Sequence, residues 1–444
     1  MPNNVGFNKD YPIIDKSNSL YERAVGLIPS VTQTLAKGPT QFVDGIAPKY
    51  LKRGKGSRVW DVDDNEFIDY NMGIGPLSLG YAIDEIDDAI KKQLEDGITF
   101  SLMHPLEVEV AEMIREIIPN AEAVKYSKTG ADVTSAAVRL ARAFTGRDKI
   151  LCCGYHGWHD WYVSVTARNF GVPEPVKNLT FTFNYNDIES LRNSIGDDTA
   201  AVILEPVVFN EPKNNFLHEV ADLCKKNGAL LIFDEMWTGF RIALGGAQEY
   251  FGIKADMATF SKAVANGMPI SILAGREDIL KLSEEHIFFY TTFGGEALSL
   301  AAAKATIEFM KKNNVIEYLD RKGIILKEGY NSIAAETGID YTKAVGYNWR
   351  SLITFDEKAG NPLELKSLVQ QEMIKRGVLW SGFHNMSFSH NDEDIDYTLK
   401  VYKEVLPILK DAVDNGKVRE AIKGKPVQPV FRKTSDFNTK PVKK

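Results

Sequence analysis

Cysteine is scarce in this chain, with only Cys152, Cys153 and Cys224 among 444 residues. So small and odd a set does not build a disulfide framework, and no CxxC pair is present to hold zinc. Free thiols favour a reducing compartment, so we expect the protein to be cytoplasmic. The first fifteen residues lack the regions of a secretory signal, and no run approaches 18 apolar residues. We therefore expect no membrane partner.

A surplus of positive charge is also missing. Lys and Arg number 53 against 60 Asp and Glu, which gives a formal net charge of −7. General nucleic-acid binding depends on clustered Lys and Arg, so we expect no nucleic-acid partner. The motifs GxGxxG and GxxxxGK[ST] are absent too, which leaves a nicotinamide dehydrogenase or a P-loop enzyme with little support.

Short apolar runs alternate with helical stretches from about residue 120 onward. The predicted strands are 123–127, 149–153, 179–183, 200–205, 229–233, 257–260 and 270–274, and the predicted helices are 132–144, 188–195, 215–227 and 297–313. Apolar strands that alternate with helices are typical of a largely parallel sheet covered on both faces. We therefore predict an α/β fold whose ligand lies at the carboxyl ends of the strands.

Changes in this pattern suggest the domain boundaries. Residues 1–60 are polar and turn-rich, and we expect an N-terminal arm that forms part of a small domain. A large domain is expected over 61–314, and a smaller α+β domain over 315–424. Residues 425–444 are basic and contain proline, which indicates a tail on the surface.

Polar residues that follow two of the predicted strands are the first candidates for a site. Asp234 follows 229–233, and Lys262 comes just after 257–260. A buried acid is costly unless it meets a cation or a hydrogen-bond donor. Alone, the acid is more often a capping residue and the lysine an exposed one. Together on neighbouring strands they suit a Schiff-base lysine and a partner for a pyridinium nitrogen.

Two further segments fit such a site. Thr129, Gly130 and Ala131 form a turn before a predicted helix, and the N–H groups at a helix N-terminus bind phosphate. An ordinary capped helix explains this turn equally well. The aromatic stretch CGYHGWHDW, residues 153–161, suits a ring-stacking site. It also suits a packed corner of the core.

In this order the segments resemble the class-III pyridoxal-phosphate aminotransferases of fold type I, and among them proteins like glutamate-1-semialdehyde 2,1-aminomutase. The resemblance covers about residues 25–410 and includes RVWDVDDNEFIDY, GYHGWHD, LLIFDEMWTGFR, FSKAVANGMP and TFGGEALSLAAA. It implies a large domain with a mostly parallel seven-stranded sheet, a smaller α+β domain and pyridoxal 5′-phosphate as cofactor. It also implies an obligate homodimer with composite active sites.

The resemblance implies a role for each matching residue. Lys262 would form the Schiff base and move the substrate proton, and Asp234 would pair with the pyridine nitrogen. Tyr155 would stack on one face of the ring, with Met236 on the other.

Other matching residues would hold the rest of the cofactor. Thr129, Gly130 and Ala131 correspond to the phosphate turn, although the family usually has a threonine where Ala131 stands. Asn210 would face the ring hydroxyl beside Glu205. Thr292 of the partner subunit would reach the phosphate.

Two departures from the family bear on the substrate. No arginine occurs from 24 to 52, so the bidentate carboxylate clamp of glutamate-1-semialdehyde aminomutases cannot form there. Glu296 stands where the family often has asparagine, and it could accept hydrogen bonds from substrate hydroxyls. It could equally face solvent or pair with an arginine. Trp158 is a second candidate for substrate contact, although packing explains any single aromatic residue here.

We therefore expect an aminotransferase that moves an amino group from an amino-acid donor, with glutamate as the first choice, to a carbonyl acceptor. The resemblance suggests a keto-sugar or a sugar-acid precursor as the acceptor. The alternative is an intramolecular aminomutase. A racemase or decarboxylase of the same fold, and a scaffold without activity, remain further alternatives.

Overall fold

The computed structural model describes residues 5, 6, 8, 10–207 and 209–429. The chain divides into two compact units. One combines the chain up to Ile83 with the chain from Glu317 onward, and the other is the continuous stretch Asp84–Ile316. The expected basic tail is described only as far as residue 429. Within the described ranges, no helix has the length and apolar character needed to cross a membrane.

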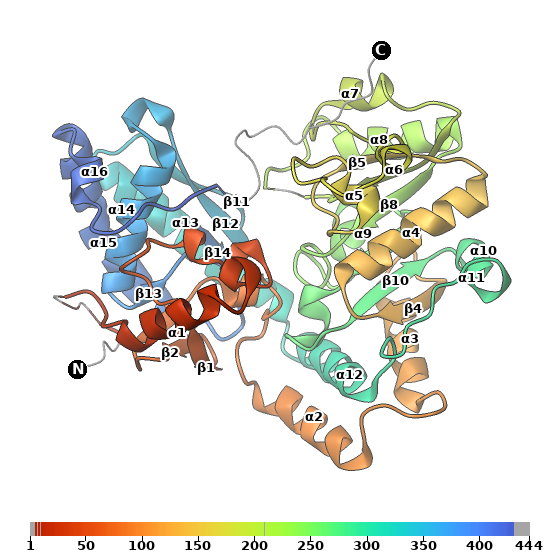
Figure 1. Ribbon diagram of the computed structural model, residues 1–444, viewed down its shortest axis with the longest axis horizontal. Coiled ribbons are helices and arrows are strands. Elements are labelled where there is room, and N and C mark those ends of the chain that lie inside the picture. Colours follow the sequence, from red (N-terminus) through yellow and green to blue (C-terminus); the bar gives the residue numbers. More distant parts are fainter. Residues whose placement is uncertain (1–4, 7, 9, 208, 430–444) are drawn as a thin grey trace. The chain divides into compact units, whose positions relative to one another are not determined.

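A seven-stranded sheet forms the centre of the Asp84–Ile316 unit, in the order β4-β10-β9-β8-β7-β5-β6 (Figure 1). Its strands are β4 (Ala123–Ser127), β5 (Lys149–Cys153), β6 (Thr180–Thr182), β7 (Thr199–Leu204), β8 (Leu230–Asp234), β9 (Met257–Phe260) and β10 (Ser271–Gly275). β10 runs antiparallel to both of its neighbours, and the other strands pair in parallel. The predicted mostly parallel α/β sheet is confirmed.

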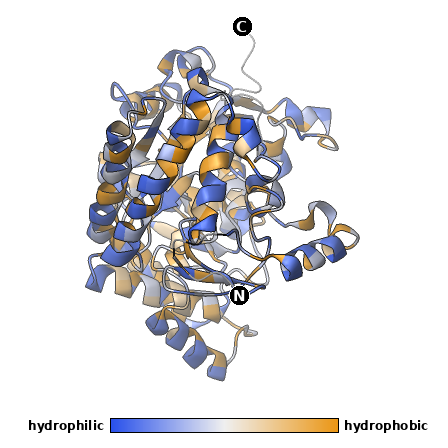
Figure 2. Ribbon diagram, turned by 90° about the vertical axis from the view of Figure 1, so that its left-hand side faces the viewer, coloured by the Kyte–Doolittle hydropathy of each residue, from blue (hydrophilic) through white to orange (hydrophobic). Residues whose placement is uncertain are grey.

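Helices cover this sheet because its strands are apolar on both faces. All six residues of β7 are buried, as expected for a strand between two helical layers. α4 (Gly130–Thr145) packs against β7 to β10, with Val133, Ala137 and Leu140 buried at helical spacing. Figure 2 shows the same alternation as stripes of hydrophobic and hydrophilic residues along the helices.

The other helices of this unit are α2 (Asp84–Asp96), α3 (Pro105–Ile117), α5 (Asp160–Val163), α6 (Glu174–Lys177), α7 (Ile188–Arg192), α8 (Phe216–Asn227), α9 (Gly246–Phe251), α10 (Glu277–Leu280), α11 (Leu282–Glu285), α12 (Ala297–Lys312) and the 3-10 turn η5 (Lys262–Ala265). α8 packs against β7 and β8, and α12 packs against η5. The turn that contains Lys262 therefore rests on a long helix.

The unit formed by the two ends of the chain contains two small sheets. One has the order β1-β2-β3-β13 and the other β11-β12-β14. Their strands are β1 (Leu51–Lys55), β2 (Arg58–Asp61), β3 (Glu66–Asp69), β11 (Thr342–Tyr347), β12 (Arg350–Phe355), β13 (Val378–Leu379) and β14 (Phe383–Asn385). β13 pairs in parallel with β3, so segments more than 300 residues apart in sequence share a sheet.

Helices and a buried polar network complete this unit. Its helices are α1 (Asp15–Val25), α13 (Val315–Glu336), α14 (Pro362–Lys375), α15 (Asp392–Asp414) and α16 (Val418–Ala421), with 3-10 turns η1 (Pro29–Val31), η2 (Leu35–Lys37), η3 (Pro39–Gln41), η4 (Met72–Ile74) and η6 (Glu357–Ala359). His384 hydrogen-bonds to Ser351 at 2.9 Å and to Tyr402 at 2.7 Å, and His390 stacks on Tyr70. Burial lowers the pKa of His384 to about 3 and that of His390 to about 4. Both imidazoles are therefore neutral at pH 7.

Candidate active site

Three ionisable residues lie at the carboxyl ends of adjacent parallel strands. Asp234 ends β8, Glu205 follows β7, and Lys262 lies two residues beyond β9. Since β9, β8 and β7 are neighbours in the sheet, their carboxyl ends bring these side chains to one edge. Asp234 and Glu205 are buried, and Lys262 is partly exposed. The sequence prediction that Asp234 and Lys262 occur on neighbouring strands is confirmed by the strand order.

Asp234 is held by a buried histidine. His156 Nδ1 lies 2.8 Å from Asp234 Oδ2, and the Met236 N–H donates to Asp234 Oδ1 at 3.1 Å. Both members of the His156–Asp234 pair are almost completely buried. His156 Nε2 is buried without a hydrogen-bond partner among the described residues. With Nδ1 donating, the pair holds one carboxylate oxygen in a fixed orientation.

Glu205 is anchored by the loop that follows β5. Its Oε2 accepts a hydrogen bond from the Tyr155 N–H at 2.9 Å. Gly154 has φ +116°, and a Cβ placed on it would lie 2.6 Å from Glu205 Oε2, so this position requires glycine. Burial raises the pKa of the Glu205 carboxyl, and the nearby Asp234 raises it further. Glu205 is therefore suited to hold a proton at this edge of the sheet.

Tyr155 places an aromatic ring at the same edge. Its ring meets that of Tyr162 edge-on at 5.6 Å, and the Tyr162 hydroxyl donates to the Gly154 carbonyl at 2.9 Å. Tyr155 is 46% exposed, so much of the ring is open to a ligand. Burial of its hydroxyl raises the pKa of Tyr155, and the neighbouring Asp234 and Glu205 add to the effect.

The turn before α4 offers a binding site for an anion. Thr129 caps the helix: its Oγ1 accepts from the Asp132 N–H at 3.3 Å, and Asp132 Oδ2 accepts from the Thr129 N–H at 2.8 Å. The N–H groups of Gly130 and Ala131 belong to the first helical turn and so have no acceptor within the helix. The positive end of the helix dipole favours a phosphate at this position.

Close contacts tie this turn to the rest of the site. A Cβ on Gly130 would lie 3.0 Å from Met236 Sδ, and a Cβ on Gly157 would lie 2.8 Å from that of Ala131. The loop after β5 and the residue two positions past Asp234 therefore both approach the start of α4. This arrangement brings together the predicted residues Thr129, Gly130, Ala131, Tyr155, Glu205, Asp234, Met236 and Lys262.

Lys262 adopts an unusual backbone conformation and lies beside an indole. Its φ is +26°, a value that a residue with a side chain rarely adopts and that is typical of functional sites. Its Nζ lies 4.6 Å from the centroid of the Trp237 ring. From the sequence, Trp237 is only a candidate for lining the entrance to the site or for packing, and His156 has no role. The motif GYHGWHD contains His156, but the motif does not reveal that this histidine pairs with Asp234, 78 residues later in the chain.

Four predicted residues lie apart from these contacts. Asn210, Thr292 and Trp158 are exposed, and within the described ranges none of them hydrogen-bonds to the group around Asp234. Glu296 caps α12, where it accepts from the Leu298 N–H at 2.8 Å. It also pairs with Lys128 at 2.7 Å. Lys128 precedes the phosphate turn, so Glu296 supports that turn from α12.

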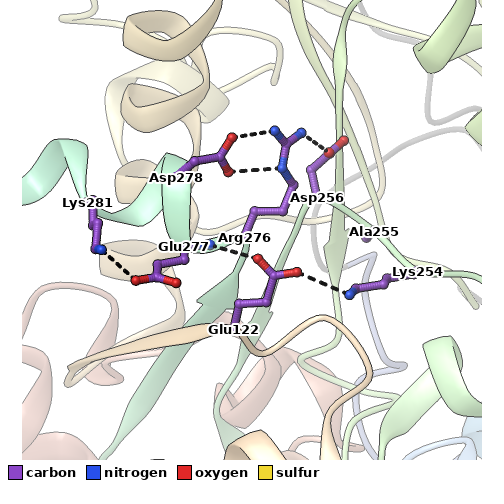
Figure 3. A pocket seen from close by; sticks show the side chains of 8 residues that line it. All are labelled: Glu122, Lys254, Ala255, Asp256, Arg276, Glu277, Asp278 and Lys281. Carbon is purple, nitrogen blue, oxygen red and sulfur yellow. Dashed lines mark hydrogen bonds and ion pairs between the residues drawn. The ribbon is translucent and has the colours of Figure 1, made fainter.

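A charged cleft of about 670 Å³ lies at the opposite edge of the sheet, before β9 and after β10 (Figure 3). Arg276 pairs there with Asp256 at 2.8 Å and with Asp278 at 2.6 Å. Lys254 and Glu122 pair at 3.3 Å. These acids and bases neutralise one another. We therefore interpret the cleft as a set of ion pairs between strand ends and not as a site of chemistry.

Comparison with known proteins agrees with this geometry. The profile of the family described as Aminotransferase class-III matches residues 44–389. The chain is 36% identical over 408 residues to a 3-aminobutyryl-CoA aminotransferase of Cloacimonas acidaminovorans, which covers 89% of this chain and 97% of the relative. It is 35% identical over 425 residues to a glutamate-1-semialdehyde 2,1-aminomutase of Archaeoglobus fulgidus, with 88% and 100% covered.

The solved structures that resemble this fold include pyridoxal-phosphate enzymes. The FumI protein of Sphingopyxis sp. MTA144, in its PLP internal aldimine form, superposes with a TM-score of 0.84 at 28% identity, over 93% of this chain and 98% of that one. A structure described as a transaminase with PLP bound gives a TM-score of 0.82 at 25% identity, over 90% and 99%.

Proposed function

This chain belongs to the class-III aminotransferases, whose cofactor is pyridoxal phosphate, and from that premise we propose that it transfers an amino group from glutamate to a hydroxylated carbonyl acceptor. One observation carries the proposal: Lys262, the Asp234–His156 pair and the first turn of α4 belong to one edge of one sheet. A keto-sugar or a sugar-acid precursor is the proposed acceptor class.

The residues present fit the cofactor. The start of α4 offers N–H groups to a phosphate, the buried Asp234 offers a carboxylate to a protonated ring nitrogen, and Lys262 offers an amine. Asp234 is only 1% exposed, and His156 supplies the hydrogen bond that a buried carboxylate requires. When bound, pyridoxal phosphate supplies an aldehyde and an electron-withdrawing ring.

The chain's own residues then bind and orient the cofactor and transfer the substrate proton. The first turn of α4 would bind the phosphate, Tyr155 and Met236 would flank the ring, and Glu205 would face its hydroxyl, with Asn210 as the further residue that the resemblance implies there. Lys262 Nζ would take the proton from the Cα of the donor amino acid. In the second half of the reaction it would give a proton to the carbon that receives the amino group. The donor amino acid leaves as a keto acid and the acceptor carbonyl becomes an amine, so no outside oxidant or reductant is needed.

The acceptor class rests on what the sequence lacks. Without an arginine between 24 and 52, no bidentate grip on a substrate carboxylate is available from that segment. Glu296 stays the predicted contact for hydroxyl groups, and Trp158 stays a predicted substrate contact. Because Glu296 already accepts bonds from Lys128 and from the start of α12, it would bind a hydroxyl only as part of that network.

The second candidate is an intramolecular aminomutase. The relatives at 34–38% identity named glutamate-1-semialdehyde 2,1-aminomutase favour it. It differs from the first proposal because it needs no external donor. If glutamate-1-semialdehyde turns over while glutamate has no effect, the aminomutase replaces the transaminase. The 3-aminobutyryl-CoA aminotransferase relative adds a coenzyme A thioester to the amino compounds worth testing.

We also propose an obligate homodimer in which Thr292 of the partner subunit reaches the phosphate. Exposed apolar side chains on the Asp84–Ile316 unit support it: Leu102, Met103 and Phe288 are each more than 75% exposed, and such surfaces mark contacts between proteins. The three cysteines are free and buried, which supports a reducing, cytoplasmic setting.

The test is an absorbance scan of the purified protein before and after glutamate is added. A yellow cofactor band that glutamate converts to the pyridoxamine form supports the proposed donor reaction, and Lys262→Ala should abolish the conversion. A yellow protein that ignores glutamate contradicts the proposed donor and favours the aminomutase. A protein that stays colourless with added pyridoxal phosphate overturns the proposed function altogether.

A further inference from the structure

Trp237 lies next to the amine that the proposed reaction uses. The centroid of its ring lies 4.6 Å from Lys262 Nζ and 5.3 Å from Arg241 Cζ. Both distances are within the range of a cation–π contact. One indole therefore lies close to two cations, and one of them is the residue that the proposed reaction uses.

The loop that carries Trp237 is held firmly. Arg241 is 4% exposed, and its guanidinium donates to the Trp237 carbonyl at 3.1 Å. Glu235 accepts hydrogen bonds from the Thr238 hydroxyl and from the Ala247 N–H at 2.8 Å. Both anchors hold the segment on either side of Trp237.

Close packing fixes the same loop against the strand that leads to Lys262. A Cβ on Gly239 would lie 2.4 Å from the Phe260 ring, so the loop touches the last residue of β9. Lys262 follows two residues later, with its strained φ of +26°. The indole and the amine therefore come from two rigid segments that are packed together.

We propose that Trp237 is a positioning residue that holds the protonated Lys262 amine against its indole face whenever that amine is not bonded to the cofactor. The inference rests on the proposed function in one respect, that Lys262 is the reacting amine. The ring attracts an ammonium and not a neutral amine, because its negative face interacts with charge. Trp237 thus keeps the amine in place between the two halves of the transfer and releases its hold when the proton leaves Nζ.

The experiment compares the accessibility of Lys262 to acylation in the full-length protein freed of cofactor. Trace labelling with acetic anhydride across pH 6 to 10, followed by peptide mass spectrometry, reports the rate at Lys262 relative to the exposed Lys92. The variants are Trp237→Leu and Trp237→Met, which remove the ring, and Trp237→Phe, which keeps a smaller one. Trp60→Leu is the matched control, since it removes the Arg53–Trp60 contact in the other unit.

We expect Trp237→Leu and Trp237→Met to label Lys262 about two- to thirtyfold faster than the native protein at low pH, as the strength of a cation–π contact implies. At the alkaline end the rates should converge, and Trp237→Phe should lie between the extremes. Trp60→Leu should match the native protein. Using two ringless variants keeps the test valid if one of them does not fold.

Two results would overturn the inference. Equal acceleration at every pH would mean that the indole merely shields Lys262, and an unchanged rate would mean that the contact has no effect on the amine. Labelling requires no turnover, so it is independent of the glutamate test. A protein that ignores glutamate yet gives the expected labelling loses the proposed reaction and keeps this role for Trp237.

Discussion

Replacing His156 by leucine should destabilise the Asp84–Ile316 unit strongly. The change removes the 2.8 Å bond to Asp234 and leaves that carboxylate 1% exposed, with the Met236 N–H at 3.1 Å as its remaining donor. Water cannot replace the lost bond at such a site. Leaving a buried acceptor without its donor costs about 1–3 kcal/mol, and more when the group is charged. We therefore expect a loss of about 3 kcal/mol.

Native-state hydrogen exchange of the β7, β8 and β9 amides is the appropriate assay, because it reports the unit that contains the pair. A loss of about 3 kcal/mol corresponds to roughly 150-fold faster exchange of the most protected amides. His156→Asn is the matched control, since its amide can still donate to Asp234, and it should lose about 1 kcal/mol. The cofactor should dissociate more readily from the leucine variant than from the asparagine variant.

Equal exchange in the leucine and asparagine variants would refute the reasoning. It would mean that the hydrogen bond from His156 does not stabilise the buried Asp234. A double-mutant cycle with Asp234→Asn sharpens the result, because contacting residues in one network should show a coupling above about 0.5 kcal/mol.

Three further predictions follow from separate features. Gly154→Ala should lower the thermal stability more than Gly146→Ala. Both glycines have positive φ, but a Cβ at 154 would clash with Glu205, whereas nothing lies within 4 Å of a Cβ at 146. Equal losses of thermal stability would contradict the close approach of Gly154 to Glu205. Glu296→Gln should lower stability by about 1 kcal/mol at pH 7, because hydrogen bonds from Lys128 and Ser299 outweigh burial and lower the pKa of Glu296. The difference should shrink as the pH falls below the ordinary glutamate pKa of about 4.3 and should vanish only once the native carboxyl is protonated as well. Unchanged kinetics with every acceptor would exclude hydroxyl recognition by this residue. Acidification from pH 7.5 to 5.5 should destabilise the unit formed by the chain ends. His384 stays neutral in the folded protein, with its pKa lowered to about 3, but it takes up a proton in the unfolded chain below about pH 6.5, and the loss should reach up to about 1.4 kcal/mol per such histidine. A His384→Gln variant whose melting temperature depends on pH with the same slope would contradict this prediction.

The large sheet could be predicted from the sequence because its strands are buried on both faces. Segments such as AAVILE and ALLIF are short, wholly apolar and separated by helical periodicity, which leaves few alternatives. The carboxyl-end rule then placed Asp234 and Lys262 at one edge without any knowledge of their side-chain contacts. Fold class, cofactor and family followed from these residues together with the resemblance.

Other features depend on contacts that a linear pattern does not contain. Sequence analysis did not single out α13 (Val315–Glu336), which includes Gly323 and Gly329. The structure gives the reason for the first glycine, since a Cβ there would lie 1.8 Å from the Asn348 carbonyl oxygen. β13 has only two residues, too few for any periodicity. Trp237 belonged to a recognised motif, but its contact with Lys262 arises only from the packing of two loops.

The parallel pairing of β3 with β13 has a consequence for how the protein is made. Ile68 meets Val378, so a ribosome that has released β3 must add 310 more residues before its partner exists. At about 5–20 residues per second, this takes roughly 15–60 s. During that time the apolar residues of β2 and β3 lack part of their final cover, while the contiguous Asp84–Ile316 unit can already fold. Premature termination before Val378 should therefore damage the beginning of the chain as severely as its end.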